Sequence, residues 1–439
     1  MKIIKSAWAV CVITTLLPGC LEVVQEPIKQ NSASTFAFVG ANIIVGDGNT
    51  VFENGVLITK KDKISAVGTS SSVQVPSDAQ VFNVTGNTII PGLVNAHGHV
   101  NDVIGLEADS SFYTEAHVET QLARYARYGV TTVMSLGGGG EAGVRVRDQP
   151  LSEREGSRLY LSGPVLTANS PSEAIKRVNE IASLGVDIIK IRVDDALGAS
   201  TKMAPEIYHA VIQESHRIGL RVAAHLYYLE DAKALLRAGV DFLAHSVRDQ
   251  PVDNELVDLL VEKNVCYCPT LMREVSTFVY EERPAWFDDP FFFKEVDPLV
   301  ITELETPEYQ EQVRNRPTSQ IYKQGLSRAL TNLNFLQSGG ARIAMGTDSG
   351  PVGRFQGYFE HAELELMVTA GLTPMQAIFA ATGQAARCLL QENKIGSLEP
   401  GKLADFVILE ANPLDDIRNS QTINSVWIGG QKIKLLPAD

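Results

Sequence analysis

Residues 86–99 read GNTIIPGLVNAHGH, and this stretch decides how the chain can fold. It is a largely apolar run of the kind that forms a buried strand, and it ends on His97 and His99. Similar runs follow along the chain, and most stretches between them have the 3.6-residue period of a helix. The eight strand-like runs span residues 86–99, 129–138, 158–166, 185–193, 220–228, 240–247, 265–271 and 341–350.

Strands that alternate with helices in this way predict an α/β fold, specifically a (β/α)8 barrel of the TIM type over residues 87–394. The segment at about 273–338 is too long for one crossover, and we expect an insertion of helices beside the barrel mouth. Both ends of the chain instead show short apolar runs separated by turn residues, a pattern typical of antiparallel strands. We therefore expect residues 36–86 and 395–439 to form one small β-sandwich domain built from both termini.

Composition and charge limit the possible partners. The chain has 439 residues, of which 44% are hydrophobic and 21% charged, and this excludes a disordered chain and a multi-span membrane protein. The net charge of −14 argues against nucleic acid as a partner, because phosphate binding needs a basic face. A small-molecule substrate and a homo-oligomer are both compatible with this composition.

The first residues are typical of an export signal. A lysine-bearing start precedes an apolar run at 7–17, which is too short to span a bilayer, and residues 1–19 are therefore predicted to be a signal peptide. The run ends in LPGC, which resembles the lipobox of bacterial lipoproteins, and this implies lipidation of Cys20. The alternative is an ordinary cleaved signal with an incidental cysteine. We expect a tether at 20–35, a location in the periplasm or cell envelope, and membrane contact only through Cys20.

Cysteines in the body of the chain show no evident disulfide framework. Cys266 and Cys268 are two apart on one strand face, so they are poorly placed to bridge each other. Cys388 is the remaining cysteine of the body. We expect the protein to depend on a large apolar core instead.

Ionisable residues gather at the predicted strand ends, where barrels of this type carry their functional groups. Each could be structural by itself: a core histidine, a paired lysine or a helix N-cap. Taken together they favour a shared metal site, because buried ionisable groups are costly unless they are paired or bind metal. The six candidates are His97, His99, Lys190, His225, His245 and Asp348.

These motifs resemble those of the amidohydrolase superfamily. The resemblance rests on PGLVNAHGH, the strand with Lys190, AAHLY, FLAHS, GTDSG and the tail GSLEPGKLADFVIL. It is strongest to the branch of imidazolonepropionases and Xaa-Pro dipeptidase-like enzymes, whose members hydrolyse amide bonds in small substrates. The resemblance implies two divalent metal ions, one bound by His97, His99 and Asp348 and the other by His225 and His245. The donor types suit Zn²⁺.

The resemblance also implies roles for two further residues. Lys190 would be carboxylated to N6-carboxylysine and bridge both ions, and without this modification the site would hold one metal. A water activated by the metals to hydroxide would attack the substrate, with Asp348 passing its proton to the leaving amine. Tyr227 would donate a hydrogen bond to the substrate carbonyl oxygen as charge develops. Its alternative interpretation is an aromatic residue at the barrel rim.

Candidate substrate contacts follow the later strands. Arg248, Arg273 and Arg354 lie just beyond strands six, seven and eight, where a guanidinium could hold a substrate carboxylate. Surface ion pairing is the alternative for each. His361, which opens the helix after the last strand, is a further pocket candidate.

The sequence therefore predicts a metal-dependent hydrolase that cleaves an amide-type C–N bond of a small substrate, such as a dipeptide, an N-acyl amino acid or a cyclic amide. A hydrolase of esters, lactones, carbamates or phosphotriesters with the same fold is an alternative, since fold alone does not select the electrophile. A non-catalytic ligand-binding lipoprotein is a third reading, although it would not need a base such as Asp348.

Overall fold

The computed structural model describes residues 35–151 and 155–435. The predicted signal peptide, Cys20 and all but the last residue of the predicted tether lie outside these residues. Within the described ranges no helix combines the length and apolarity that crossing a membrane requires.

Eight parallel strands form the barrel in two hydrogen-bonded arcs, one with the order β10-β9-β6 and the other with the order β11-β12-β13-β14-β15. The strands are β6 (Leu93–Gly98), β9 (Val130–Ser135), β10 (Arg158–Leu161), β11 (Ile188–Val193), β12 (Arg221–Leu226), β13 (Phe242–Ala244), β14 (Cys266–Cys268) and β15 (Arg342–Ile343). Nearly all of their residues are buried, as expected for parallel strands covered on both faces.

Hydrogen bonds close the barrel at two seams between these arcs. At one seam the Leu166 amide donates to the Lys190 carbonyl at 2.8 Å. At the other, the Ala96 amide donates to Met345 at 2.9 Å, and the Asp348 amide donates to the His97 carbonyl at 2.7 Å. The predicted α/β barrel class is confirmed, and the second seam joins two predicted metal ligands through the main chain.

Amphipathic helices surround the strands. In α3, Pro171 occupies the first turn, the Ser170 side chain accepts from the Glu173 amide, and the apolar side chains are buried against the barrel. The outer helices are α1 (Glu115–Arg127), α2 (Glu141–Asp148), α3 (Pro171–Ala182), α4 (Pro205–Arg217), α5 (Leu229–Ala238), α6 (Asn254–Glu262), α11 (Pro317–Ser338), α12 (Tyr358–Thr369), α13 (Pro374–Ala380) and α14 (Gly383–Cys388).

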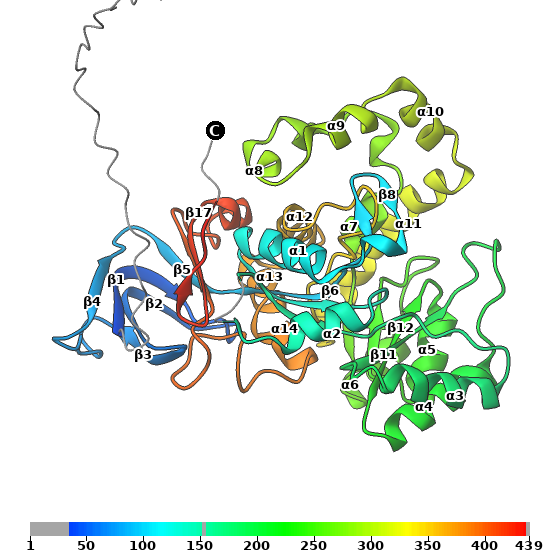
Figure 1. Ribbon diagram of the computed structural model, residues 1–439, viewed down its shortest axis with the longest axis horizontal. Helices are drawn as coiled ribbons and strands as arrows, with labels where there is room; N and C mark the ends of the chain where they lie inside the picture. The colour runs from blue at the N-terminus through cyan, green and yellow to red at the C-terminus, as the bar shows by residue number, and fades with distance from the viewer. Residues whose placement is uncertain (1–34, 152–154, 436–439) are drawn as a thin grey trace, which may run out of the picture.

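The long segment between β14 and β15 divides into two parts. Its last helix, α11, returns to the barrel and buries Ala329, Leu333 and Leu336 in the main core. The helices before it pack around an aromatic cluster that includes Phe287, and α8–α10 arch over one side of the molecule (Figure 1). These helices are α7 (Leu271–Val275), η3 (Val279–Glu281), η4 (Ala285–Asp288), α8 (Pro290–Phe293), α9 (Pro298–Leu304) and α10 (Pro307–Asn315). A short hairpin and turn, β7 (Val103–Ile104), β8 (Glu107–Ala108) and η1 (Ser110–Phe112), follow β6.

Strands from both ends of the chain share the second sheet, which lies beside the barrel (Figure 1). Its main path is β18-β17-β16-β5-β1-β2-β3, and β4 pairs with β1. The sheet curls, as shown by an antiparallel bridge between Lys63, the first residue of the edge strand β3, and Leu403, which lies shortly before β16. Its elements are β1 (Thr35–Ile44), β2 (Val51–Lys60), β3 (Lys63–Thr69), β4 (Gln80–Asn83), β5 (Thr88–Pro91), β16 (Phe406–Leu409), η5 (Ile417–Gln421), β17 (Ile423–Ile428) and β18 (Gln431–Lys432).

The stretch at 86–99 is two strands rather than one. β5 pairs with β1 and β16 in the curled sheet, whereas β6 belongs to the barrel. Gly92 separates them at a point where a Cβ would collide with the Thr131 side chain. The curled sheet therefore extends to Pro91, beyond the predicted boundary at residue 86.

A disulfide that was not evident in the sequence joins Cys266 to Cys388, across 122 residues and with a Cα–Cα distance of 5.8 Å. It connects strand β14 to the end of α14. As expected, Cys266 does not bridge to Cys268, whose thiol is buried and free.

Candidate metal centre

Five of the six predicted metal ligands lie at or just beyond the carboxyl ends of barrel strands, and Lys190 lies within β11. His97 and His99 follow from β6, and Asp348 from the loop after β15. Four of the side chains are almost fully buried, with exposed fractions of 1% for His97, 3% for Lys190, 2% for His245 and 6% for Asp348. A tight approach of β15 to β6 builds this end of the barrel, since a Cβ on Gly346 would lie only 2.7 Å from the His97 amide nitrogen.

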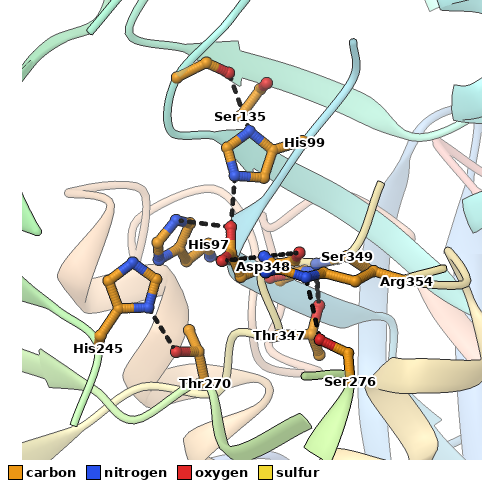
Figure 2. Close-up of polar contacts among 12 residues, drawn as sticks. His97, His99, Ser135, His245, Thr270, Ser276, Thr347, Asp348, Ser349 and Arg354 are labelled. Carbon is orange, nitrogen blue, oxygen red and sulfur yellow. Dashed lines mark hydrogen bonds and ion pairs between the residues drawn. The ribbon is translucent and has the colours of Figure 1, made fainter. Parts of the chain in front are cut away.

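His97, His99 and Asp348 form a compact donor set. Their ligand atoms all lie within 4.8 Å of one another. Asp348 Oδ1 is 2.5 Å from His99 Nε2 and 3.5 Å from His97 Nε2, so both imidazoles point at one carboxylate oxygen (Figure 2). Imidazole nitrogens and a carboxylate oxygen are a donor set that suits Zn²⁺ and similar divalent ions.

His225 and His245 extend this set across the barrel. Their ring centroids are 4.1 Å apart, and the His245 ring centroid is 4.7 Å from that of His97. Lys190 Nζ is buried and has no hydrogen-bond partner among the described residues, and the same holds for His97 Nδ1. Orphaned buried polar atoms are expensive. A carbamate on Lys190 would carry oxygen atoms able to bind a cation, and the donors of His97, His99 and Asp348 suit the same kind of ion, so the residues present fit a divalent metal centre.

The second nitrogen of three histidines is engaged outside the cluster. His99 Nδ1 donates to the Gly137 carbonyl at 2.9 Å, and His245 Nδ1 lies 2.7 Å from Thr270 Oγ1. His225 Nε2 hydrogen-bonds the Asp194 carboxylate. These contacts leave Nε2 of His99 and His245, and Nδ1 of His225, available as ligand atoms.

Asp194 is a residue in contact with the cluster that was not among the predicted site residues. It follows Lys190 by four positions, directly after β11, and it is buried. An acidic residue immediately after a strand that carries a predicted ligand is the signal that could have revealed it. Although burial raises its pKa, the hydrogen bond from His225 holds the pKa of the Asp194 carboxyl well below its usual range.

Burial favours the neutral forms of His97, His225 and His245. It lowers the pKa of His97 and His245 well below the usual value, and it lowers the pKa of His225 to about 3 despite the nearby Asp194. Burial also lowers the pKa of Lys190 to about 8. Metal ligands and a carbamate-forming amine must be unprotonated, and this environment favours those forms.

Asp348 is held as an anion. Burial raises its pKa, but the Arg354 guanidinium and the hydrogen bond to His99 hold it well below the usual range. Arg354 Nη1 pairs with Asp348 Oδ2, while Arg354 Nε donates to Ser276 Oγ at 3.1 Å. Figure 2 shows Arg354 approaching Asp348 from the side opposite His97.

Three residues of the site have left-handed backbone conformations. The φ angles are +88° at His245, +57° at Asp348 and +49° at Thr270. Such conformations are uncommon for residues other than glycine and cost of order 1–3 kcal/mol each where they are strained. The surrounding structure thus holds His245, Asp348 and Thr270 in uncommon backbone conformations, and these conformations fix the directions of their side chains.

Arg248 and Arg273 share one buried carboxylate, Glu274. Arg248 Nε is 3.0 Å and Arg273 Nη1 is 3.1 Å from Glu274 Oε1. Arg248 also donates to the Leu226 carbonyl at 3.0 Å, and its guanidinium lies 4.5 Å from the Tyr227 ring centroid. These contacts are to groups of the protein itself, while its buried Nη2 has no hydrogen-bond partner within the described residues, so the substrate contact of Arg248 stays a prediction.

Arg273 keeps a donor free. Its guanidinium lies 4.7 Å from the centroid of the Tyr322 ring, which α11 contributes, and its buried Nε has no partner within the described residues. The Tyr322 ring is in turn 6.4 Å from that of Tyr227. The structure thus groups Tyr227, Arg273 and the insertion beside the metal cluster.

His361 does not reach this cluster, which corrects its assignment as a pocket residue. It is buried on α12, with Nδ1 2.9 Å from Ser420 Oγ and Nε2 2.8 Å from the Tyr128 carbonyl. Both nitrogens are used to join the barrel to the C-terminal segment. Its position at the start of the helix after β15 did not reveal this, because the contacts of its ring are to Ser420 and Tyr128, both far away in the sequence.

A family model matches residues 88–433 and is described as the amidohydrolase family. The chain belongs to the amidohydrolase family. This assignment confirms the resemblance that the strand-end motifs indicated, and it covers both the barrel and the C-terminal strands of the curled sheet.

Two curated relatives are similar to this amidohydrolase over more than half of its length. The chain is 25% identical over 284 residues to an ochratoxinase of Aspergillus niger, across 62% of this chain and 52% of that protein. It therefore spans about half the length of that relative. It is 22% identical over 395 residues to an imidazolonepropionase of Geobacillus sp. (strain WCH70), covering 82% and 84% of the two chains.

Solved structures share the fold. A candidate prolidase from Bifidobacterium longum superposes with a TM-score of 0.72 and 26% identity, over 92% of this chain and 95% of that one. A Xaa-Pro dipeptidase with bound methionine gives a TM-score of 0.73 at 22% identity, over 91% and 99%.

Proposed function

We propose that this amidohydrolase is a metal-dependent hydrolase that cleaves an amide-type C–N bond in a small substrate bearing a carboxylate. The observation that carries the proposal is the buried cluster of His97, His99, His225, His245, Lys190 and Asp348, in which Lys190 Nζ and His97 Nδ1 have no partner among the described residues. A site arranged for stability alone would not leave such groups buried and unpaired.

Two divalent ions, held by His97, His99 and Asp348 and by His225 and His245 with carboxylated Lys190 between them, would supply a Lewis acid and a water of lowered pKa. Asp348 accepts the proton of the attacking water and returns it to the leaving nitrogen. Arg354 keeps the Asp348 carboxylate ionised and holds its Oδ2 in place through the ion pair.

Substrate binding is assigned to the side of the site that faces the insertion. Arg273 offers its free Nε to a substrate carboxylate, and Arg354 lies on the same side of Asp348. Tyr227 donates a hydrogen bond to the carbonyl oxygen of the scissile bond. Burial raises the pKa of this phenol, which therefore stays protonated and able to donate.

The names of the related proteins support an amide electrophile. An ochratoxinase, an imidazolonepropionase and a Xaa-Pro dipeptidase are among the proteins that this chain is similar to. A hydrolase of esters, lactones, carbamates or phosphotriesters is the second candidate, because the same site chemistry serves those electrophiles.

Metal analysis followed by a substrate panel tests this function. Purified protein is expected to hold one or two equivalents of divalent metal and to turn over members of a panel of dipeptides and N-acyl amino acids. Each dipeptide is paired with its C-terminal amide, which lacks the carboxylate that Arg273 would bind. Protein without stoichiometric metal contradicts the proposal, and equal turnover of acids and amides contradicts the role of Arg273. Turnover confined to esters or phosphotriesters selects the second candidate.

A Lys190→Ala variant tests the bridging carbamate. Metal content is expected to fall, and added short-chain carboxylic acids are expected to restore part of it, because they replace the two missing oxygens. Unchanged metal content without any effect of the acids contradicts carboxylation of Lys190.

We also propose export to the cell envelope, with lipidation of Cys20 as the anchor. The Cys266–Cys388 disulfide supports this location, because disulfides persist in oxidising compartments. Cys20→Ala is expected to move the protein from the membrane fraction to the soluble envelope fraction. An unchanged distribution contradicts the lipid anchor.

A further inference from the structure

Two glutamates one turn apart on α12, Glu360 and Glu363, are buried against the segments around Asp348 and Thr270. Both side chains belong to residues with an exposed fraction of 0%. Residues at i and i+3 share one face of a helix, so the pair forms a single acidic stripe. Neither residue is among the predicted ligands, yet each accepts hydrogen bonds from a segment that carries or contacts a ligand.

Glu360 connects the two segments that carry His97 and Asp348. Its Oε1 accepts hydrogen bonds from three side chains: Asn95 Nδ2 at 2.6 Å, Thr347 Oγ1 at 2.7 Å and Ser349 Oγ at 2.6 Å. Thr347 and Ser349 flank Asp348 directly. Asn95 is two residues before His97 and accepts from its amide at 2.9 Å. One carboxylate therefore ties the strained turn at Asp348 to strand β6.

Glu363 holds a different segment, the entry to α7. Its two oxygens accept from the Leu271 amide at 2.8 Å and the Met272 amide at 2.7 Å. The residue before this pair is Thr270, whose hydroxyl lies 2.7 Å from His245 Nδ1. The residue after it is Arg273, the proposed carboxylate ligand. Glu363 therefore controls where the partner of His245 and the substrate-binding arginine stand.

We infer that Glu360 and Glu363 are positioning residues that set the two halves of the metal centre separately. Glu360 orients the half with His97 and Asp348, whereas Glu363 orients His245 and Arg273. The inference about metal binding rests on the residues alone, and the part that concerns catalysis rests on the proposed function. Partners of metal ligands commonly change metal affinity or activity by about 10- to 100-fold when they are removed.

Glutamine variants break each link with little change in volume. In Glu360→Gln an NH₂ group replaces one of the two carboxylate oxygens. Either Oε2 is lost as the acceptor for the Gly357 amide at 2.6 Å, or Oε1 is lost as the acceptor for the three side-chain donors. In Glu363→Gln one backbone amide loses its acceptor and faces another donor. A matched control is Glu365→Gln on the same helix, since Glu365 is only half-buried and accepts from Gln421 at 2.9 Å, away from the site.

The test uses metal-free full-length protein titrated with Co²⁺ alone, followed by its visible absorption. Glu360→Gln and Glu363→Gln are each expected to bind Co²⁺ at least about tenfold more weakly than the parent, while Glu365→Gln stays within twofold. The two variants are also expected to alter different transitions in the Co²⁺ spectrum, because they displace different ligands. Parent-like affinity and spectra in both variants, with unchanged near-ultraviolet circular dichroism, overturn the inference.

Kinetics with a substrate from the panel separate the two roles. Glu360→Gln is expected to lower kcat with little change in KM, and Glu363→Gln to raise KM for the free acid more than for its amide. Equal effects of both variants on both constants overturn the division into halves. If a glutamine variant does not fold, Ser349→Ala and Glu363→Asp replace them, with smaller changes expected in the same directions. Weakened Co²⁺ binding in a protein that hydrolyses nothing in the panel would retain the positioning roles and reject the proposed reaction.

Discussion

The core of the curled sheet and the polar cluster at the barrel mouth are both buried, but they are built in opposite ways. In the sheet, Phe38 packs edge-on against Phe406 and Trp427 with centroids 5.0 Å apart in each case, and Phe406 stacks on Trp427 at 5.7 Å. At the mouth, charged and neutral ligand groups converge, and Lys190 Nζ is buried without a hydrogen-bond partner among the described residues.

This difference indicates that the curled sheet contributes mainly to stability and the barrel mouth mainly to binding. Aromatic packing stabilises the fold because each ring is satisfied by its neighbours. At the mouth, unpaired buried groups such as Lys190 Nζ lower the stability of the fold locally. Such groups would gain partners if a metal or substrate were bound. Mutations in the two regions should therefore have effects of opposite kind: on unfolding but not on metal in the sheet, and on metal or turnover but little on unfolding at the mouth.

The largest effect is expected at the mouth, for Asp348→Asn. An amide cannot accept the proton of the attacking water, so kcat should fall by about 10²- to 10⁴-fold, while part of the metal is retained. Measurements are kcat and metal content of the purified variant, with thermal unfolding as the control for folding. Activity equal to that of the parent would show that Asp348 carries no proton.

In the sheet, Trp427→Ala should have the converse result. Trp427 is 3% exposed, and truncating such an aromatic residue costs about 3–5 kcal/mol of unfolding free energy. Chemical denaturation measures this loss, and Co²⁺ titration of the same sample should match the parent. A large loss of Co²⁺ affinity would mean that the two regions are not separable.

His361 offers a sharper version of the comparison, because it is a buried histidine with partners for both nitrogens. Burial lowers its pKa to about 4, against an ordinary value of 6.5. Below pH 6.5 the unfolded chain takes up the proton first, so this residue lowers the unfolding free energy progressively from pH 6.5 towards pH 4, by roughly 2 kcal/mol at pH 5. Above pH 6.5 it has no such effect.

Comparison of the parent with His361→Gln isolates this contribution, because all other groups titrate in both proteins. The difference in unfolding free energy between pH 7 and pH 5 should be smaller in the variant. His216→Gln, in which the replaced histidine is exposed, serves as the control. Identical pH dependence in parent and His361→Gln would exclude a neutral buried imidazole at this position.

An effect of similar size to that of His361 is expected for Asp194→Asn, which weakens the contact that orients His225. Metal affinity should fall by about 10- to 100-fold, with thermal stability almost unchanged. Competition with a chelator measures the affinity. The neighbouring Asp195→Asn is the matched control, because Asp195 accepts from the Tyr228 hydroxyl at 2.7 Å and makes no contact with the cluster. Equal affinities in the two variants would assign Asp194 a purely structural role.

Much of the fold could be predicted from the chain itself because its signals are local. Eight apolar runs with helical stretches between them are enough for a parallel barrel, and the barrel then brings the ends of distant strands together. For this reason His97 and Asp348, 251 positions apart in the sequence, could be placed in one cluster. The insertion was recognisable by its length alone.

Other features depend on contacts that no local pattern records. The split at Gly92 arises from the close approach of Thr131, and the partner of Cys266 is decided by where α14 ends. The direction of a side chain also depends on tertiary contacts: His361 contacts Ser420, and Arg248 contacts Glu274.

The sequence by itself determined the barrel, its second sheet and the chemical types gathered at the mouth, because periodicity and strand-end position are properties of short segments. Only the tertiary structure decided which nitrogen of each histidine is free, that Asp194 supports His225, and that Glu360 and Glu363 hold the segments around Asp348 and Thr270. Those decisions depend on distances of about 3 Å between residues far apart in the chain. Such distances exist only once the helices have packed on the barrel.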